Sequence, residues 1–471
     1  MRDVRAILIV SAVAVAGILF TNSVSLARGF FARPQDVAAP RIDGVLLDDV
    51  SYSSQWPLAH MSVPVLWQQG HHGSHDVIVA ILGSGFDWNS IDMAGNVFVN
   101  EAESGDASDN GIDDDHNGLV DDYRGWNFVD STRDVWAYSE LTNAAALAMG
   151  ARAGNRVGVV GINWATQILP VRILDGRGAS TPDRVARGID YAWSMGAKVI
   201  LCLWAGATTS PELEAAVARA RSAGALIVAP AGDSGVDLDR TRVYPASIES
   251  DGILAVGASD SQRRRMTGSN YGLNSIDLFA PGELMRDAGA VGNPSHLAAA
   301  NAAGVAALVR AAWDRTQITL SVNDWRERIV NGCTRAHALR GLARCEGVID
   351  ALNTFVGTHT APAWPQEDQW IDFAYRFESA HPYGATTDIR GEARIPGARF
   401  VRAVIDAYDI EDPYDRLTIS DAQDIAAETI TGAGGARATA FVTGETIRFR
   451  LTSDASVHKW GFAVTKLQFV R

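Results

Sequence analysis

The chain has few cysteines, no cluster of basic residues and little continuous apolar sequence. With three cysteines among 471 residues, it can form at most one internal disulfide. Its 41 basic side chains are outnumbered by 55 acidic ones, and the formal net charge is −14. Because no basic block occurs anywhere, this composition argues against nucleic acid as a partner. The length predicts two or three globular domains.

Long apolar runs are absent outside the N-terminus. There, Arg2 and Arg5 precede an uncharged apolar run over residues 6–20 and the small-x-small pattern Ser25-Leu26-Ala27. This pattern predicts a secretory signal peptide over 1–27, with cleavage after Ala27, although an uncleaved membrane anchor is an alternative. We therefore expect an exported protein that is extracellular, periplasmic or at the cell surface, with no other contact to a membrane.

The three cysteines differ in their surroundings. Cys333 and Cys345 are close enough in sequence to close a short loop in an oxidising compartment, and we predict a disulfide between them. Cys202 lies within an apolar run, which indicates a buried free thiol.

Continuous apolar runs alternate with helical patterns in the first three quarters of the chain. The predicted buried strands are 77–82, 168–174, 198–204, 225–229 and 253–256, and the predicted helices are 181–195, 211–223 and 297–309. Buried strands that alternate with helices predict an α/β fold, in which a mainly parallel sheet is flanked by helices. Such sheets place ligands at the carboxyl ends of their strands.

Ten ordered blocks of this sequence resemble landmarks of the subtilisin-like serine peptidases, the subtilases. They lie at 52–56, 77–87, 158–162, 168–175, 188–192, 196–200, 229–232, 244–247, 255–258 and 277–282. The resemblance covers about residues 48–355 and implies the subtilisin-like fold. We expect an N-terminal extension over 28–75, the subtilisin-like domain over 76–357, and a Pro-containing linker over 358–366.

The resemblance also locates the four positions at which the family carries its chemistry. A subtilase uses a Ser nucleophile, a His base, an Asp that orients the His, and an Asn that stabilises the oxyanion. In this chain the orienting position is Gly83, the base position is Glu140, the nucleophile position is His296 and the oxyanion position is Asp233. All four are substituted, so the resemblance implies an exported pseudopeptidase that acts by binding.

Ser295 lies one residue before the nucleophile position. One residue on a helix is about 100° of rotation, so Ser295 serves as a nucleophile only if the helix start is rewound. An active serine endopeptidase with misregistered catalytic residues therefore remains the first alternative. Glu140 and His296 are predicted to form an ion pair. With Asp233 they also suggest a metal site, and a metal-dependent hydrolase using Glu140 and His296 is the second alternative.

The substrate-binding strand of the family is also altered. Subtilases carry Ser-Trp-Gly or Ser-Leu-Gly at this strand, whose backbone pairs with the peptide substrate. This chain has Leu203-Trp204-Ala205 there. We expect the strand edge to persist with a changed groove, and a protein or peptide as the ligand, such as a peptide, a peptidase or a peptidase inhibitor.

Much of the acidic surplus lies between residues 106 and 122. Asp113, Asp115, Asn117 and Asp121 follow the spacing by which an EF-hand-type loop places oxygen ligands around Ca²⁺. The twelfth loop position is Arg124, so the bidentate Glu of an EF-hand is missing. We predict structural calcium here. Asp49 and Asn155 match positions near another calcium site of the family, which is a weaker signal.

The last hundred residues have a different pattern. Short alternating strands at 400–405, 416–420, 446–451 and 462–469 predict a C-terminal β-sandwich over 367–471. Its motifs resemble CUB domains, although the CUB disulfides are absent, and this resemblance implies a calcium site at Glu411, Asp415 and Asp454. CUB-like modules commonly bind proteins or glycans. The sequence gives no indication of the oligomeric state.

Overall fold

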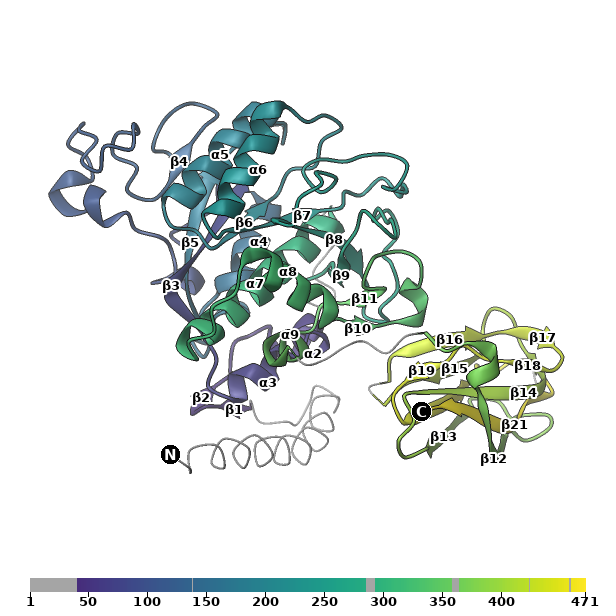
Figure 1. Ribbon diagram of the computed structural model, residues 1–471. Coiled ribbons are helices and arrows are strands. Elements are labelled where there is room, and N and C mark those ends of the chain that lie inside the picture. Colours follow the sequence, from purple (N-terminus) through teal and green to yellow (C-terminus); the bar gives the residue numbers. More distant parts are fainter. Residues whose placement is uncertain (1–39, 138, 285–292, 358–363, 423, 457–458) are drawn as a thin grey trace, which may run out of the picture.

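The computed structural model describes residues 40–471 except 138, 285–292, 358–363, 423 and 457–458. The predicted signal peptide and most of the predicted linker lie outside the described residues. Figure 1 shows an α/β domain, in purple to green, and a smaller β-sandwich, in yellow. The predicted fold class is confirmed for both parts of the chain.

The α/β domain is built on a nine-stranded sheet with the order β10-β11-β9-β8-β7-β6-β3-β5-β4. Its strands are β3 (Gly73–Gly83), β4 (Trp126–Asn127), β5 (Ala165–Arg172), β6 (Val199–Cys202), β7 (Leu226–Pro230), β8 (Ile253–Ser259), β9 (Leu278–Pro281), β10 (Thr334–Arg335) and β11 (Gly347–Val348). All neighbouring pairs are parallel except β10 and β11, which are antiparallel. Parallel strands buried on both faces explain why the strand sequences are apolar without alternation.

Helices cover both faces of this sheet. They are α4 (Glu140–Gly150), α5 (Pro182–Ser194), α6 (Pro211–Ser222), α7 (Pro294–Arg315), α8 (Val322–Asn331) and α9 (Ala351–Val356). Successive residues of a strand point to opposite faces. Accordingly, Val79 and Ile81 pack in the core that contains α4, α7 and α8, whereas Ala80 and Leu82 pack in the core that contains α5 and α6.

Helix α7 is the buried centre of the domain. Every residue from Ser295 to Val309 is buried, as the run of small apolar residues predicts. At Gly304 a Cβ atom would lie 2.7 Å from Ile162 Cδ1, so the absence of a side chain lets the neighbouring backbone approach the helix. Because the helix is fixed on all sides, its N-terminal residues Ser295 and His296 have defined positions at the carboxyl end of the sheet.

The segment before β3 packs onto the α/β core. It contains β1 (Arg41–Ile42), β2 (Val45–Leu46), α2 (Trp56–His60) and α3 (Val63–Gln68). Trp67 is fully buried, and its indole donates a hydrogen bond to the carbonyl of Ile162 (3.0 Å). The described part of the predicted N-terminal extension therefore shares its core with the subtilisin-like domain. Short 3₁₀ turns occur at Tyr52–Ser54, Ile91–Met93, Glu101–Glu103, Gly105–Ala107, His337–Leu339 and Glu367–Gln369.

The C-terminal domain consists of two antiparallel sheets that enclose their own core. One sheet has the order β12-β21-β14-β17, with β18 and β19 also paired to β14, and the other has the order β13-β20-β15-β16. The strands are β12 (Ile371–Glu378), β13 (Asp388–Arg394), β14 (Phe400–Ile410), β15 (Arg416–Ser420), β16 (Ala426–Ile430), β17 (Gly432–Gly434), β18 (Arg437–Ala438), β19 (Val442–Thr443), β20 (Thr446–Thr452) and β21 (Gly461–Val470).

The cysteines lie as the sequence suggests. Cys333 and Cys345 are joined by a disulfide, with their Cα atoms 6.4 Å apart, and Cys202 is a buried free thiol. Across the described ranges, no helix combines the length and the apolar character needed to cross a bilayer.

Candidate functional site

The N-terminus of α7 meets the loop after β7 at the carboxyl end of the sheet. Asn293 is the N-cap residue of α7 but makes no side-chain capping hydrogen bond. Asp233 caps the helix instead: Ser295 N–H donates to its Oδ1 (2.9 Å), and Ser295 Oγ donates to its Oδ2 (2.9 Å). A carboxylate at a helix N-terminus is favoured by the helix dipole and satisfies free N–H groups. Asp233 is therefore a structural partner of α7.

Ser295 is enclosed by these bonds. Its hydroxyl also accepts a hydrogen bond from Gly232 N–H (3.1 Å), and the residue has no exposed surface. A catalytic Ser must reach a substrate carbonyl and transfer its proton to a base. The hydroxyl of Ser295 is buried and points its proton at a carboxylate that already accepts from the helix, so this arrangement does not present a nucleophile.

His296 belongs to the same cluster, but its imidazole is not arranged as that of a catalytic base. Its Nδ1 lies 3.3 Å from Asp233 Oδ2 and 3.4 Å from Ser295 Oγ. In a Ser-His-Asp triad the two imidazole nitrogens face different partners, one the Ser and the other the Asp. Here both partners share Nδ1, so the ring cannot relay a proton from Ser295 to Asp233 through its two nitrogens.

The predicted Glu140–His296 ion pair is wrong. Glu140 is exposed at the first turn of α4, where an acidic side chain is favoured by the helix dipole, and the imidazole of His296 is paired with Asp233. Among the described residues, two groups of three acidic side chains bring their potential metal-ligand atoms within 4.8 Å of one another. Neither group contains Glu140, Asp233 or His296. The geometry therefore also contradicts a metal-dependent hydrolase built on Glu140 and His296.

Gly83 is the last residue of β3, at the position where the family carries its orienting Asp. A Cβ atom there would lie 3.0 Å from Thr142 Oγ1 and 3.1 Å from Thr142 Cγ2. Thr142 is buried in the first turn of α4, and Ser139 Oγ caps that turn by accepting from Thr142 N–H. The space beside Gly83 is thus occupied by the start of α4, and no carboxylate is available there to orient a base.

The segment corresponding to the substrate strand follows β6. Leu203 N–H donates to Leu82 O (2.8 Å), which continues the pairing with β3. Trp204 is buried in the core with α5 and α6, whereas Ala205 is half-buried, and its N–H has no partner among the described residues. After it, Gly206 forms a two-way backbone bridge with Tyr244 (2.9 and 2.8 Å). The described residues therefore leave the N–H of Ala205, in a half-buried residue of this strand edge, without an acceptor.

The acidic segment gathers a different set of carboxylates from the predicted one. Glu103, Asp113 and Asp115 approach one another within 4.8 Å. Glu103 has no exposed surface, and its Oε2 is buried without a hydrogen-bond partner. Burial raises the pKa of Glu103. Carboxylate oxygens are the ligands that Ca²⁺ prefers, and an unpartnered buried carboxylate oxygen fits a cation at this point.

Asp121 and Asn117 do not complete this group. Asp121 has a left-handed φ of 55°, and its carboxylate accepts from the N–H groups of Asn110 (3.0 Å) and Gly111 (3.2 Å). Asn117 donates through Nδ2 to Asp115 Oδ2 (3.0 Å) and to Asp122 Oδ2 (3.0 Å). The NH2 group of its side-chain amide, and not the oxygen, therefore faces these carboxylates. The predicted spacing thus identified two of the three clustered residues, Asp113 and Asp115.

Asp122 ties this segment to the α/β domain. It has no exposed surface, and its Oδ2 accepts a hydrogen bond from Tyr191 of α5 (2.7 Å). Asn100 donates through Nδ2 to Asp122 Oδ1 (2.7 Å) and to Asp115 Oδ2 (2.9 Å). Burial raises the pKa of Asp122. This network connects the carboxylate cluster with a helix that covers the sheet.

Glu411, Asp415 and Asp454 in the β-sandwich form the second acidic group within 4.8 Å. Asp415 has no exposed surface, and its Oδ1 accepts from Asp454 N–H (2.9 Å). The turn before β15 and the end of β20 bring these three side chains together. The residues that the sequence motif singles out are therefore neighbours in space.

Asp49 and Asn155 also lie together, joined by a third residue. Asp49 accepts from the N–H groups of Gly154 (2.9 Å) and Asn155 (3.3 Å). Asn155 Nδ2 donates to Asp92 Oδ1 (2.8 Å), and burial raises the pKa of both carboxylic acids. Sequence reasoning missed Asp92, because it lies far along the chain from both partners.

Comparison with known proteins agrees with this fold. The sequence profile of the subtilase family, Peptidase_S8, matches residues 74–348, which is more than half of the chain. The chain belongs to the subtilase family.

Relatives of this subtilase have protease names. It is 35% identical over 211 residues to the thermophilic serine proteinase of Bacillus sp. (strain AK1), and the match covers 45% of this chain and 45% of that protein. It is 34% identical over 176 residues to thermitase of Thermoactinomyces vulgaris, covering 37% of this chain and 61% of thermitase. It is 27% identical over 344 residues to the extracellular basic protease of Dichelobacter nodosus, covering 64% of this chain and 55% of that protein. The matched regions thus leave large parts of each relative unmatched.

Proposed function

We propose that this subtilase is an exported pseudopeptidase that binds a protein or peptide ligand and does not cleave it. The observation that carries the proposal is the hydrogen-bonded cluster at the start of α7. Ser295 Oγ is buried between Asp233 and Gly232 N–H, and His296 shares one ring nitrogen between Ser295 and Asp233. With Gly83 at the orienting position, the site lacks an accessible nucleophile, a relay base and a carboxylate to orient one.

The rival function is that of the relatives whose names describe proteases. A fluorophosphonate probe, which modifies activated Ser residues, distinguishes the two functions. The intact chain is expected to show no labelling under conditions in which thermitase is labelled stoichiometrically. Mass spectrometry that located the probe on Ser295, together with cleavage of casein abolished by Ser295→Ala, would establish an active peptidase.

Binding is supported by the half-buried strand edge at Ala205. An extended peptide that adds to a strand edge gains main-chain hydrogen bonds, and the unpaired N–H of Ala205 supplies one donor for this mode. Ala205→Pro removes that donor and is expected to weaken binding of fluorescent casein-derived peptides. Ala207→Pro, at an exposed residue of the same segment, is the control. Equal affinities for both variants would argue against binding at this edge.

Calcium is proposed at two structural sites. Glu103, Asp113 and Asp115 supply carboxylate oxygens at the first, and Glu411, Asp415 and Asp454 supply them at the second, in the CUB-like sandwich. A bound divalent cation would offset the repulsion between these carboxylates, one of which is fully buried in each group. Calorimetric titration with Ca²⁺ is expected to give two sites per chain, and a protein that neither binds nor is stabilised by Ca²⁺ would contradict this.

A further inference from the structure

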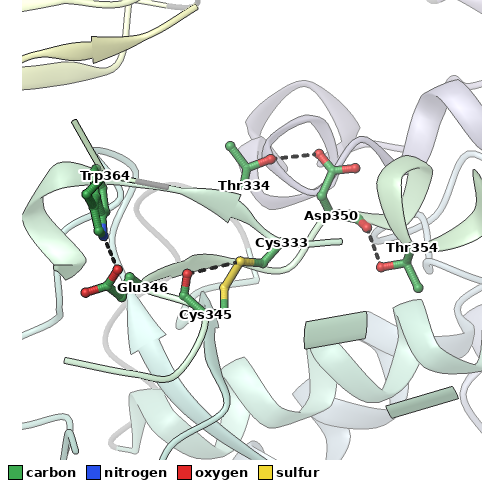
Figure 2. The surroundings of a disulfide bond; sticks show 7 residues. All are labelled: Cys333, Thr334, Cys345, Glu346, Asp350, Thr354 and Trp364. Carbon is green, nitrogen blue, oxygen red and sulfur yellow. Dashed lines mark hydrogen bonds between the residues drawn. A yellow bond between two sulfur atoms is a disulfide. The ribbon is translucent and has the colours of Figure 1, made fainter. Parts of the chain in front are cut away.

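One short loop of the subtilase domain contacts the β-sandwich and the segment that leads into it. We call residues 333–346 the clip loop, because the Cys333–Cys345 disulfide closes it. Trp364 directly precedes the sandwich, and its indole N–H donates to the carboxylate of Glu346 in the clip loop. Figure 2 shows this hydrogen bond beside the disulfide. The guanidinium groups of Arg335 and Arg340 each lie 5.7 Å from the centre of the Trp364 ring, within cation–π distance.

Aromatic rings continue the contact into the sandwich. His337 of the clip loop lies edge-on to Phe441, with ring centres 4.7 Å apart. Phe441 also lies 5.3 Å from Trp364, and both pack with the fully buried Phe400. These rings form a small apolar core that is separate from the core of the sandwich. It is completed only while His337 and Trp364 stay in place.

The clip loop has little regular structure to hold this surface. Strand β10 lies in the loop and β11 directly follows the loop; the two strands pair through two residue pairs only, and β11 joins β9 through one. The disulfide adds a covalent link between the residue before β10 and a residue two positions before β11. Figure 1 shows β10 and β11 on the side of the α/β domain that faces the sandwich. Small interfaces between domains permit relative motion unless something fixes them.

Glu346 connects the disulfide to the interface. It directly follows Cys345 and has a φ of 56°, in the left-handed region that side chains other than Gly rarely adopt. In this conformation its Oε1 accepts from Gly341 N–H (2.8 Å), and its Oε2 accepts from Trp364. Residues in strained conformations persist only where their surroundings fix them. Release of Cys345 would let Glu346 relax to negative φ and turn its carboxylate away from Trp364.

We propose that the Cys333–Cys345 disulfide is a latch that holds the β-sandwich against the subtilase domain, and that its reduction frees the sandwich while both domains stay folded. A dithiol supplies two electrons and two protons, the S–S bond becomes two thiols, and the reductant becomes its own disulfide. The ion pair of Arg263 with Asp421 (3.5 Å) is a second contact between the domains and lies outside the clip loop.

The test compares the intact chain with the same chain after treatment with dithiothreitol, and with the double variant Cys333→Ala/Cys345→Ala. Burial raises the pKa of Cys202 to about 12, so alkylation at neutral pH reports the opening of the latch. Opening is expected to raise amide hydrogen exchange at 337–339 and 442–443 at least tenfold, and to increase the radius of gyration. Exchange in β3, β6, β14 and β20 is expected to stay unchanged.

Glu346→Ala tests the same idea with the disulfide intact. It removes the acceptors for Trp364 and Gly341 and is expected to loosen the same segments, whereas Glu346→Gln keeps one of the two acceptor oxygens and should loosen them less. Two results would overturn the proposal. One is unchanged exchange at 337–339 and 442–443 after complete reduction. The other is a tenfold rise throughout the subtilase strands, which would make the disulfide a general staple of the fold.

Discussion

The capping of α7 by Asp233 predicts a large effect of one substitution. Asp233→Ala leaves Ser295 N–H and Ser295 Oγ, both in a residue without exposed surface, without their acceptor. Each unsatisfied buried donor costs about 1–3 kcal/mol, and loss of the charge at the helix N-terminus adds about 0.3–1 kcal/mol. Since the Asp233 side chain is 13% exposed, water can replace part of the loss. We expect the free energy of unfolding to fall by about 2–4 kcal/mol.

Differential scanning calorimetry of the subtilase transition measures this effect. A loss of that size lowers the melting temperature by roughly 3–7 °C for a domain of this length. Glu140→Gln is the control, because it also removes a negative charge near a helix N-terminus, but from an exposed side chain. It should change stability by no more than about 0.5 kcal/mol. If the two variants melt at the same temperature, the capping role of Asp233 is refuted.

Three further predictions concern the oxyanion position, the acidic segment and the joint between the domains. Asp233→Asn restores the amide of the family but should remain unlabelled by fluorophosphonate, because Ser295 stays buried and without a base; labelling would contradict the pseudopeptidase assignment. Glu103→Gln should weaken Ca²⁺ binding at least tenfold in a calorimetric titration, whereas Asp121→Asn should retain it, because Asp121 bonds to backbone N–H groups; equal losses would contradict the assignment of Glu103. Burial, with the nearby charge of Arg340, lowers the pKa of His337 below 6.5, against an opposing effect of Glu428. The docked sandwich therefore favours neutral His337, and docking is fully present above pH 6.5 and weakens as pH falls below it. Scattering at pH about 7.5 and about 5.5 should show the radius of gyration increasing on acidification in the intact chain but not in His337→Phe.

The sheet and its helices were predictable because their signals are local. Continuous apolar runs such as 77–82 can be buried only in a sheet covered on both faces, and the small residues of 297–309 suit a helix enclosed by neighbours. The order of the ten family-like sequence blocks then indicated which strand ends lie close together. These signals depend on side-chain type and spacing, which the sequence gives directly.

The side-chain partners at the site depend on long-range geometry. Ser295 is of a residue type that often caps helices, but α7 begins at Pro294, and the cap comes from Asp233, which is distant in sequence. Glu140 occupies the family position of the base, yet its side chain is exposed, so position alone did not determine its partner. In the acidic segment, Asp121 has the predicted spacing, but its backbone has a left-handed φ and its side chain is not part of the carboxylate cluster. The third carboxylate of the cluster is that of Glu103.

The same cluster accounts for the stability of this site and supports the proposal that the site does not catalyse proteolysis. Catalysis of acyl transfer needs donors that stay free to meet an oxyanion, held in place before the substrate arrives. At the start of α7 the Ser, His and Asp groups satisfy one another, and the carboxylate of Asp233 lies where the family places a donor. Freeing Ser295 would leave buried donors unpaired and cost stability, as in the general conflict between stability and activity. Under the proposed function, catalysis would require several simultaneous changes, at Gly83, Glu140, Asp233 and His296, because any one alone loses a structural bond or lacks its catalytic partners.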